Sequence, residues 1–259
     1  MKLAIFQGQS IVSDVESNLQ KMAGVINAAA AQGADIIVFP ELFLTGYNMK
    51  NKTSSLAEPV DGPSSATIKK MAIRHNIGVL YGYPEKVGEE CFNSAQMINS
   101  SGECISNFRK NHLFGPMEKE FFTPGNDIAL FDLGGLTFGI LICYDIEFPE
   151  IARKSVLSGA NVILVPTATD SPYEEVATTV VRARAYENQV FVAYVNHSGI
   201  EDDITFIGTS GIIGPDGKDI CRAGQHNEAL MVTEINPEAF ALSISQNTYL
   251  RDRRPELYI

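Results

Sequence analysis

The feature that most constrains the fold of this chain is a regular alternation of strand and helix patterns from one end to the other. Short apolar runs rich in β-branched residues, such as ADIIVFP (34–40) and NVILVP (161–166), alternate with segments that carry helical signals. No linker interrupts this order, and 45% of the 259 residues are hydrophobic, which is enough to bury a sizeable core. Helices that alternate with strands and hairpins predict a mixed sheet covered by helices. We therefore expect a single α/β domain over residues 1–259.

Local patterns place the individual elements. Ser13 and Glu16 form a capping-box pattern, which predicts the start of a helix that runs towards Gly33. Further helices are expected at 64–75, 149–158 and 173–188. Strands are expected at 2–8, 34–40, 77–84, 136–143, 161–166 and 190–196, with a hairpin over 91–110 and two more strands around a turn at 214–217.

One pattern occurs twice. GADIIVFPE (33–41) and GANVILVPT (159–167) share a helix-ending glycine, an alanine, a polar residue, four apolar residues and a proline. A fold built from two related α–β halves would produce this echo. Two ordinary helix-to-strand units would also produce it, so both explanations stay open at this point.

Charge and cysteine usage exclude several partners. The net charge of -11 argues against nucleic acid or an anionic membrane surface as a partner. No run of 18 apolar residues is present, and MKLAIFQGQS at the N-terminus lacks the features of a signal peptide. The four cysteines form no CxxC pair and the histidines show no metal-ligand spacing. We expect a cytoplasmic protein without a metal site.

Three chemically capable residues each follow a predicted strand, namely Glu41, Lys110 and Cys143. Strand ends in α/β sheets are where loops present functional side chains. A carboxylate can take the proton of a thiol, and a lysine ammonium can favour the thiolate and stabilise the oxyanion of a tetrahedral intermediate. These residues are sufficient for acyl transfer without histidine or metal. Taken singly, Cys143 could equally be a small buried hydrophobe, and the other two could be a loop acid and a surface lysine.

Three motifs in this chain resemble the signatures of the nitrilase, or carbon–nitrogen hydrolase, superfamily. They are FPELFLTGY (39–47), RKNHLFG (109–115) and ICYDIEFPE (142–150), and they occur in the order typical of that superfamily. The resemblance covers essentially the whole chain. It implies a four-layer αββα sandwich, a cysteine thioester acyl-enzyme, no cofactor, and assembly into a homodimer or a higher homo-oligomer.

The same resemblance implies a role for each site residue. Glu41 would be the general base, Lys110 the residue that stabilises the oxyanion, and Cys143 the nucleophile. Glu118 falls where many members carry a second acid that positions the substrate and the catalytic water, although the neighbouring Glu120 could be that acid instead.

The motifs are most similar in wording to those of bacterial 5-aminopentanamidases, whose substrate carries an ammonium far from the amide. Members that act on carboxylate-bearing substrates typically have arginine three or four residues after the nucleophile, where this chain has Ile146 and Glu147. An acid at Glu147 favours a cationic substrate. Glu147 could instead cap the helix that follows it. The side chains expected to bind a small-molecule amide are Tyr47, Tyr144, Glu147, Thr167 and Ala168.

Other activities remain open on the sequence alone. The chain could act on an α-amino amide, an ω-carboxy amide or an N-carbamoyl amine, it could be a true nitrilase, or it could have kept the sandwich as a non-catalytic binding protein. We expect His112 to be structural, because Glu41 already supplies a base, and Arg184 to pair with Glu187 on one helix face. The tail at about 245–259 is basic and aromatic, and we expect it to pack on a partner subunit.

Overall fold

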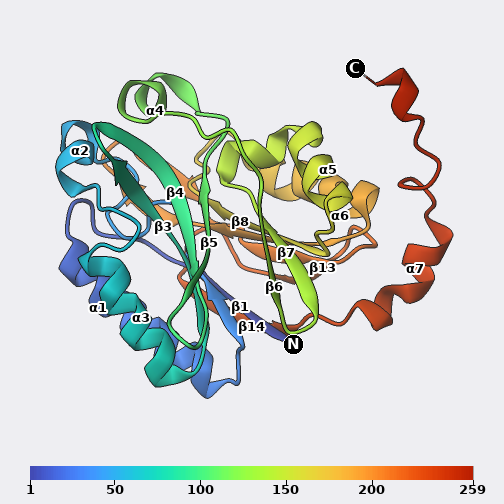
Figure 1. Cartoon of the computed structure of the whole chain (residues 1–259), viewed down its shortest axis with the longest axis horizontal. Coiled ribbons are helices and arrows are strands. Elements are labelled where there is room, and N and C mark those ends of the chain that lie inside the picture. Colours follow the sequence, from blue (N-terminus) through green and yellow to red (C-terminus); the bar gives the residue numbers. More distant parts are fainter. Residues whose placement is uncertain (259) are drawn as a thin grey trace.

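Two six-stranded sheets lie face to face in the computed structural model, which describes residues 1–258, and helices cover their outer faces (Figure 1). Helices α1 (Val15–Ala31) and α3 (Pro63–His75) cover the first sheet. Helices α5 (Pro149–Leu157) and α6 (Val181–Asn188) cover the second. The architecture is therefore the four-layer αββα sandwich predicted from the sequence.

The strands of each sheet follow a fixed spatial order. The first sheet consists of β14 (Ala229–Glu234), β1 (Lys2–Gln7), β2 (Ile36–Val38), β3 (Gly78–Val87), β4 (Glu90–Ile98) and β5 (Cys104–Arg109). The second consists of β6 (Ala129–Leu133), β7 (Leu136–Ile140), β8 (Val162–Thr167), β9 (Phe191–Asn196), β12 (Gly211–Ile213) and β13 (Asp219–Arg222). A separate ribbon pairs β10 (Ser198–Glu201) with β11 (Ile204–Ile207). Shorter helices are α2 (Thr53–Leu56), α4 (Gly115–Phe121) and α7 (Ala241–Gln246).

The two sheets have the same topology. In each, three parallel strands lie side by side, one antiparallel strand pairs with the trio on one flank, and two strands follow on the other flank, each antiparallel to its inner neighbour. The repeated segments 33–41 and 159–167 contain β2 and β8, which are the middle strands of the two parallel trios. The echo in the sequence thus corresponds to equivalent positions in two α–β halves of the same design.

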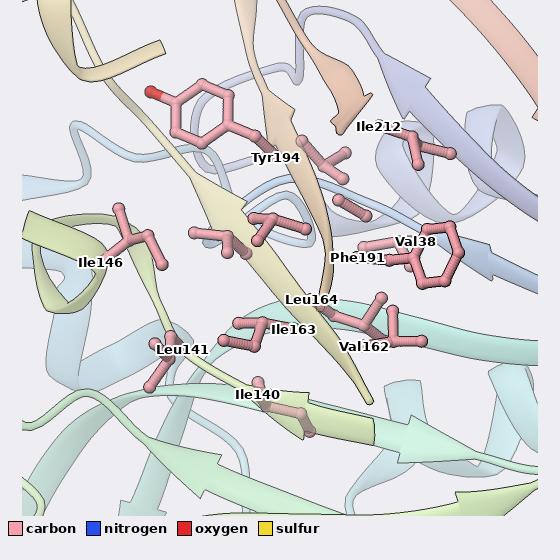
Figure 2. Close-up of a cluster of buried hydrophobic side chains, with 14 of the residues drawn as sticks. Val38, Ile140, Leu141, Ile146, Val162, Ile163, Leu164, Phe191, Tyr194 and Ile212 are labelled. Atoms are coloured by element: carbon pink, nitrogen blue, oxygen red, sulfur yellow. The ribbon is translucent and has the colours of Figure 1, made fainter. Parts of the chain in front are cut away.

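The core lies between the sheets and beneath the helices. In β2, Ile36 and Val38 face the central cluster between the sheets, whereas Ile37 faces the cluster beneath α1 and α3. This alternation follows from the two-residue period of a strand, and it explains why a strand buried on both faces reads as a continuous apolar run. Val38 belongs to the same buried cluster as Leu164 and Phe191 of the second sheet (Figure 2).

Several predicted boundaries differ from the structure, and three of the differences have a visible local cause or change an expected feature. The N-cap of α1 is Asp14, whose carboxylate accepts a hydrogen bond from the Ser17 backbone N–H at 3.0 Å. Ser13 has a left-handed φ of 64°, which places it in the preceding turn, so the expected capping box is wrong. The helix expected at 173–188 begins at Glu174, passes through a π-helical turn at Val176–Val180 and continues as α6. The strand expected at 136–143 ends at Ile140.

The last part of the chain lies outside the α5–α6 layer (Figure 1). The tail makes few contacts with the domain; among them are a hydrogen bond from Asn247 Nδ2 to the Tyr186 carbonyl at 3.1 Å and an edge-to-face contact between the Tyr186 and Tyr249 rings. Leu242 and Leu257 remain 70% and 61% exposed. Among residues 1–258, no helix combines the length and apolarity needed to cross a membrane.

Candidate active site

Three strand ends bring Glu41, Lys110 and Cys143 to one place. Glu41 lies beyond β2, Lys110 follows β5, and Cys143 begins the 3₁₀ turn η2 (Cys143–Glu147) beyond β7. The Lys110 ammonium donates hydrogen bonds from Nζ to Glu41 Oε1 and to Glu118 Oε1, both at 2.7 Å. The side chains of all three members of this ion-pair group are completely buried. Their charges perturb the pKa of the Cys143 thiol, so the thiol lies within their electrostatic reach.

The second acid of this group is Glu118, on α4. Its Oε1 also accepts a hydrogen bond from the Tyr47 hydroxyl at 2.7 Å, and its Oε2 accepts one from the Phe114 backbone N–H at 2.9 Å. Glu120 is exposed on the same helix. Of the two candidates that the sequence left open, only Glu118 is therefore placed at the site.

The Glu41 carboxylate has two different oxygens. Oε1 accepts hydrogen bonds from Lys110 and from Asn93 Nδ2, each at 2.7 Å. Oε2 is buried and has no hydrogen-bond partner among residues 1–258. Burial raises the pKa of Glu41 above its usual value, and the neighbouring Lys110 ammonium opposes that rise. Oε2 is thus a buried oxygen of increased basicity with a free lone pair.

Lys110 remains a cation despite its burial. Burial by itself lowers the pKa of an ammonium, but the Glu118 and Glu41 carboxylates outweigh it and hold the pKa of Lys110 well above its usual range. The ammonium can therefore act as a fixed positive charge at neutral pH.

Cys143 sits at a conformationally unusual point of the chain. Its φ is 47°, a left-handed value that is uncommon for a non-glycine residue and that turns the chain sharply from β7 into η2. Its Sγ lies 3.8 Å from Thr169 Oγ1. Burial raises the pKa of the Cys143 thiol to about 12, the Glu41 carboxylate adds to this effect, and Lys110 opposes it. Lys110 thus acts in the expected direction, in favour of the thiolate, but burial and the carboxylates outweigh it, so the thiol needs a base to lose its proton.

His112 ties two loops of the site together. The Asp145 carboxylate lies 2.7 Å from His112 Nδ1 and accepts hydrogen bonds from the backbone N–H of His112 at 2.9 Å and of Ile142 at 3.1 Å. The imidazole also stacks on the Phe148 ring, with centroids 3.9 Å apart. This network joins the loop after Lys110 to the turn that carries Cys143, which is the structural role expected for His112.

A small pocket opens above Cys143. The remaining lining residues are Tyr47, Phe114, Tyr144, Glu147, Ala168, Thr169, Asp170 and Tyr173. Its volume is about 20 Å³, which is close to the space of one water molecule. Thr167, expected in the wall, is not among these lining residues; it ends β8, and its Oγ1 contacts Thr169 Oγ1 at 2.9 Å. The Thr167 side chain also acts on the Cys143 thiol and lowers its pKa, so the hydroxyls of both Thr167 and Thr169 lie beside Cys143.

Two half-buried carboxylates, those of Glu147 and Asp170, line this pocket. Burial raises the pKa of both groups. Neither forms an ion pair with any residue of the described chain, 1–258. The N-cap of α5 is Phe148, and no side chain caps that helix, so Glu147 does not have the capping role considered for it.

Arg184 supports the turn that carries Glu147. Its guanidinium donates hydrogen bonds to the backbone carbonyls of Ile146 and Glu147, at 2.9 and 2.8 Å. It also forms the expected ion pair with Glu187, at 3.1 Å. Arg184 of α6 therefore fixes the end of η2 through two backbone carbonyls, while its ion-pair partner Glu187 lies on α6 itself.

Several site residues escaped the sequence analysis. Asn93 appeared only as part of a predicted hairpin, although a polar residue inside a buried strand is itself a signal of function. Thr169 and Asp170 directly follow Thr167 and Ala168, the residues predicted to line the pocket, in the segment TATD. Their position next to those residues is the signal that could have identified them. Phe114 and Tyr173 carry no pattern of their own. Within residues 1–258, no group of three or more His, Cys, Asp or Glu side chains is arranged to hold a metal ion.

Comparison with known proteins extends these observations. The family model described as carbon-nitrogen hydrolase matches residues 2–242. The chain is 45% identical over 261 residues to a protein from Pseudomonas protegens described as a hydrolase in the pqqF 5' region, covering 100% of this chain and 90% of that protein. It is 32% identical over 255 residues to an (R)-stereoselective amidase from a Pseudomonas species, covering 98% and 92%.

Solved structures include a similar amidase from Nesterenkonia sp. Its crystal structure superimposes with a TM-score of 0.90 at 30% sequence identity, covering 100% of this chain and 95% of that one. A cysteine-to-alanine mutant of the same amidase has been solved in complex with butyramide. The likeness therefore extends over the whole sandwich and all three strand ends described above.

Proposed function

Since this chain belongs to the carbon–nitrogen hydrolase family, we propose that it is an amidase that hydrolyses a linear primary amide bearing a distant ammonium group, such as 5-aminopentanamide. The products are the carboxylate and ammonia. The observation that carries this proposal is the buried Oε2 of Glu41, which has no hydrogen-bond partner in residues 1–258 and belongs to a carboxylate that acts on the pKa of Cys143, a residue lining the pocket. A protein that only binds ligands would have no need of such an uncompensated base.

The first half of the reaction forms a thioester. Glu41 Oε2 accepts the thiol proton while Sγ of Cys143 attacks the amide carbonyl carbon. The Lys110 ammonium, with the backbone N–H groups that follow Cys143, stabilises the resulting oxyanion. Collapse of this intermediate breaks the carbon–nitrogen bond, and the nitrogen leaves as ammonia after it receives the proton from Glu41.

The second half of the reaction hydrolyses the thioester. A water molecule loses a proton to Glu41 as its oxygen attacks the acyl carbon, and the proton then returns to the departing sulfur. Glu118 positions the substrate and this water from the far side of Lys110. Because Tyr47 and the Phe114 N–H both donate to Glu118, its carboxylate keeps a constant orientation through both halves.

The charge of the pocket favours a cationic substrate. Glu147 and Asp170 are half-buried and form no ion pair in the described part of the chain, although Lys110 and Arg184 act on Glu147 from a distance, so a substrate ammonium could pair with them directly. The Tyr144 and Tyr173 rings offer aromatic faces to the same cation.

We expect 5-aminopentanamide to be a better substrate than amides of equal length that end in a methyl group or a carboxylate. A charge-assisted hydrogen bond contributes roughly 1.5–3 kcal/mol, so the preference over the neutral amide should be roughly ten- to a hundredfold in kcat/KM. Glu147→Gln should remove most of this preference and leave hydrolysis of the neutral amide nearly unchanged. Ammonia release by the two enzymes on all three amides measures the effect.

Two results would contradict this assignment of substrate. One is a carboxylate-ended amide that proves to be the best of the series. The other is an equal loss on charged and neutral amides in Glu147→Gln, which would mean that Glu147 supports η2 and does not contact the substrate. A wider screen over α-amino amides, N-carbamoyl amines and nitriles covers the other activities that the sequence leaves open.

The acid limit of activity should lie above pH 4.5. Glu41 acts only when ionised, and burial raises its pKa above the usual 4.5, so activity is present above the raised pKa and is lost as the pH falls through it. Lys110, whose pKa is raised, stays charged over the whole range. The measurement is kcat/KM against pH on a neutral amide, which avoids any contribution from Glu147. Full activity at pH 4.5 would assign the base to another group.

We propose further that the protein works in the cytoplasm as a homo-oligomer in which the tail at about 245–259 packs on a partner subunit. The support is the exposure of apolar side chains along the end of the chain, among them Tyr249 and Tyr258 at 50% and 55%. Aromatic and aliphatic groups left in water at this density are typical of surfaces that a partner covers. Ile259 lies outside the described residues.

A further inference from the structure

One short segment behind the site contacts three of its loops at once. It runs from the last residue of β9, Asn196, to the last residue of β10, Glu201, and it contains His197. Asn196 and His197 are 0% exposed, and Glu201 is 2% exposed. None of them lines the pocket above Cys143, so none is placed to touch the substrate.

His197 contacts the backbone of the proposed base. Its Nε2 lies 2.6 Å from the Glu41 carbonyl oxygen. Burial lowers the pKa of His197, so the imidazole is neutral at neutral pH and carries a single N–H. Because the partner at Nε2 is a carbonyl, which can only accept, the proton must be on Nε2. Nδ1 is buried without a hydrogen-bond partner in residues 1–258, which agrees with this tautomer.

The ring of His197 is also held by its neighbours. It stacks between Phe43 and Phe206, at centroid distances of 5.8 and 4.9 Å and interplanar angles of 24° and 28°. The residue after Glu41 is Leu42, whose φ of 50° lies in the left-handed region and requires support from its surroundings. The hydrogen bond from a rigidly stacked imidazole to the preceding carbonyl provides that support at the turn where the base is carried.

Asn196 and Glu201, at the two ends of this segment, bind the loops that carry Thr169 and Tyr47. Asn196 Oδ1 accepts a hydrogen bond from the Thr169 backbone N–H at 2.9 Å, and its Nδ2 donates to the Thr169 carbonyl at 3.0 Å. Glu201 Oε2 accepts hydrogen bonds from the backbone N–H groups of Tyr47 and Asn48, both at 3.0 Å. The Thr169 hydroxyl lies 3.8 Å from Cys143 Sγ, and the Tyr47 hydroxyl donates to Glu118.

We propose that His197 is a positioning residue for Glu41, and that Asn196 and Glu201 position the Thr169 wall and the Tyr47–Glu118 pair from the same segment. The inference rests on the proposed role of Glu41 as the base. The base, the pocket wall and the second acid therefore share one buried support, the segment from Asn196 to Glu201, which does not contact the substrate. A displacement of this segment should change kcat more than it changes substrate binding.

The test replaces His197 by phenylalanine and by glutamine. His197→Phe keeps a ring between Phe43 and Phe206 but cannot donate to the Glu41 carbonyl, whereas His197→Gln can place an amide N–H near the position of Nε2. A displacement of about 1 Å at a reacting group can cost on the order of 10²-fold, so we expect that loss in kcat for His197→Phe with KM little changed. His197→Gln should recover most of the loss. His226→Phe, at an exposed histidine, is the control and should behave as the wild type.

The pH profile separates positioning from a general loss of structure. If His197→Phe lets the Glu41 carboxylate move away from Lys110, the ammonium opposes protonation less and the acid limb of kcat/KM moves to higher pH. A destabilised but otherwise unchanged site would lose amplitude without moving that limb. If the phenylalanine variant does not fold, His197→Asn takes its place, because its shorter amide does not reach the Glu41 carbonyl.

Two results would overturn the proposal: wild-type kcat and an unmoved acid limb in His197→Phe, or equal losses in the phenylalanine and glutamine variants with an unmoved limb. Long-range ¹H–¹⁵N spectra of the wild-type protein test the tautomer separately, and a proton on Nδ1 would also overturn it. If the wild type hydrolyses no amide but His197 is found as the Nε2–H tautomer, the proposed function fails while the geometric basis of this inference stands.

Discussion

Replacing Cys143 by alanine should abolish amide hydrolysis and leave the fold intact. The substitution removes Sγ, the atom with which Cys143 would form the thioester. Losses on the order of 10⁶-fold in kcat accompany removal of the nucleophile in a hydrolase with a catalytic triad. Cys143 is a partly buried residue at the edge of the central core cluster, and alanine lacks only its sulfur, so the substitution leaves no large cavity. Ammonia release measures the loss, and thermal unfolding checks the fold.

The other three cysteines provide the matched control. Cys104→Ala, at an exposed position, should retain wild-type turnover. With substrate present, mass spectrometry of the denatured wild-type enzyme should find the acyl group on the peptide that contains Cys143. An acyl group on Cys91 or Cys221, or turnover in Cys143→Ala, would remove Cys143 from the role of nucleophile.

Glu41→Gln should reduce kcat/KM by ~10⁴-fold or more, at or beyond the upper end of the usual contribution of a general base. The amide oxygen of glutamine can still accept from Lys110 and Asn93, so the shape of the site is kept. The NH₂ group then occupies the place of Oε2 and cannot take a proton. The loss is large because Cys143, with a pKa of about 12, has almost no thiolate at neutral pH unless a base removes the proton.

Two further variants help to interpret this result. Glu120→Gln changes the same functional group at an exposed position and should leave the rate unchanged. Binding of a neutral amide to Glu41→Gln, measured by calorimetry, should remain close to that of Cys143→Ala. Near-normal turnover in Glu41→Gln would require another base, and His112 would be the first residue to replace.

The sequence by itself determined the layers of the fold and the three residues at its centre. The alternation of apolar strand runs with helical patterns predicts a mixed sheet covered by helices, and the resemblance of three motifs to a known superfamily implies the four-layer αββα arrangement of those elements. Glu41, Lys110 and Cys143 could be proposed because each follows a predicted strand and because the three motifs that resemble the superfamily signatures single out the same positions. The echo between 33–41 and 159–167 was visible for the same reason, although only the topology showed that its two copies occupy equivalent strands.

The tertiary structure alone decided the electrostatic state of these residues and the identity of their supports. The thiol of Cys143 is protonated because burial and the carboxylates that face it outweigh Lys110, and that balance depends on groups that lie far apart in the chain. Glu118 was separated from Glu120 by the direction in which α4 presents each side chain. His197 lies 156 positions from the carbonyl that it contacts, so no local pattern could have assigned it to Glu41. Hydrogen bonds over such separations exist only once the two sheets have packed against each other.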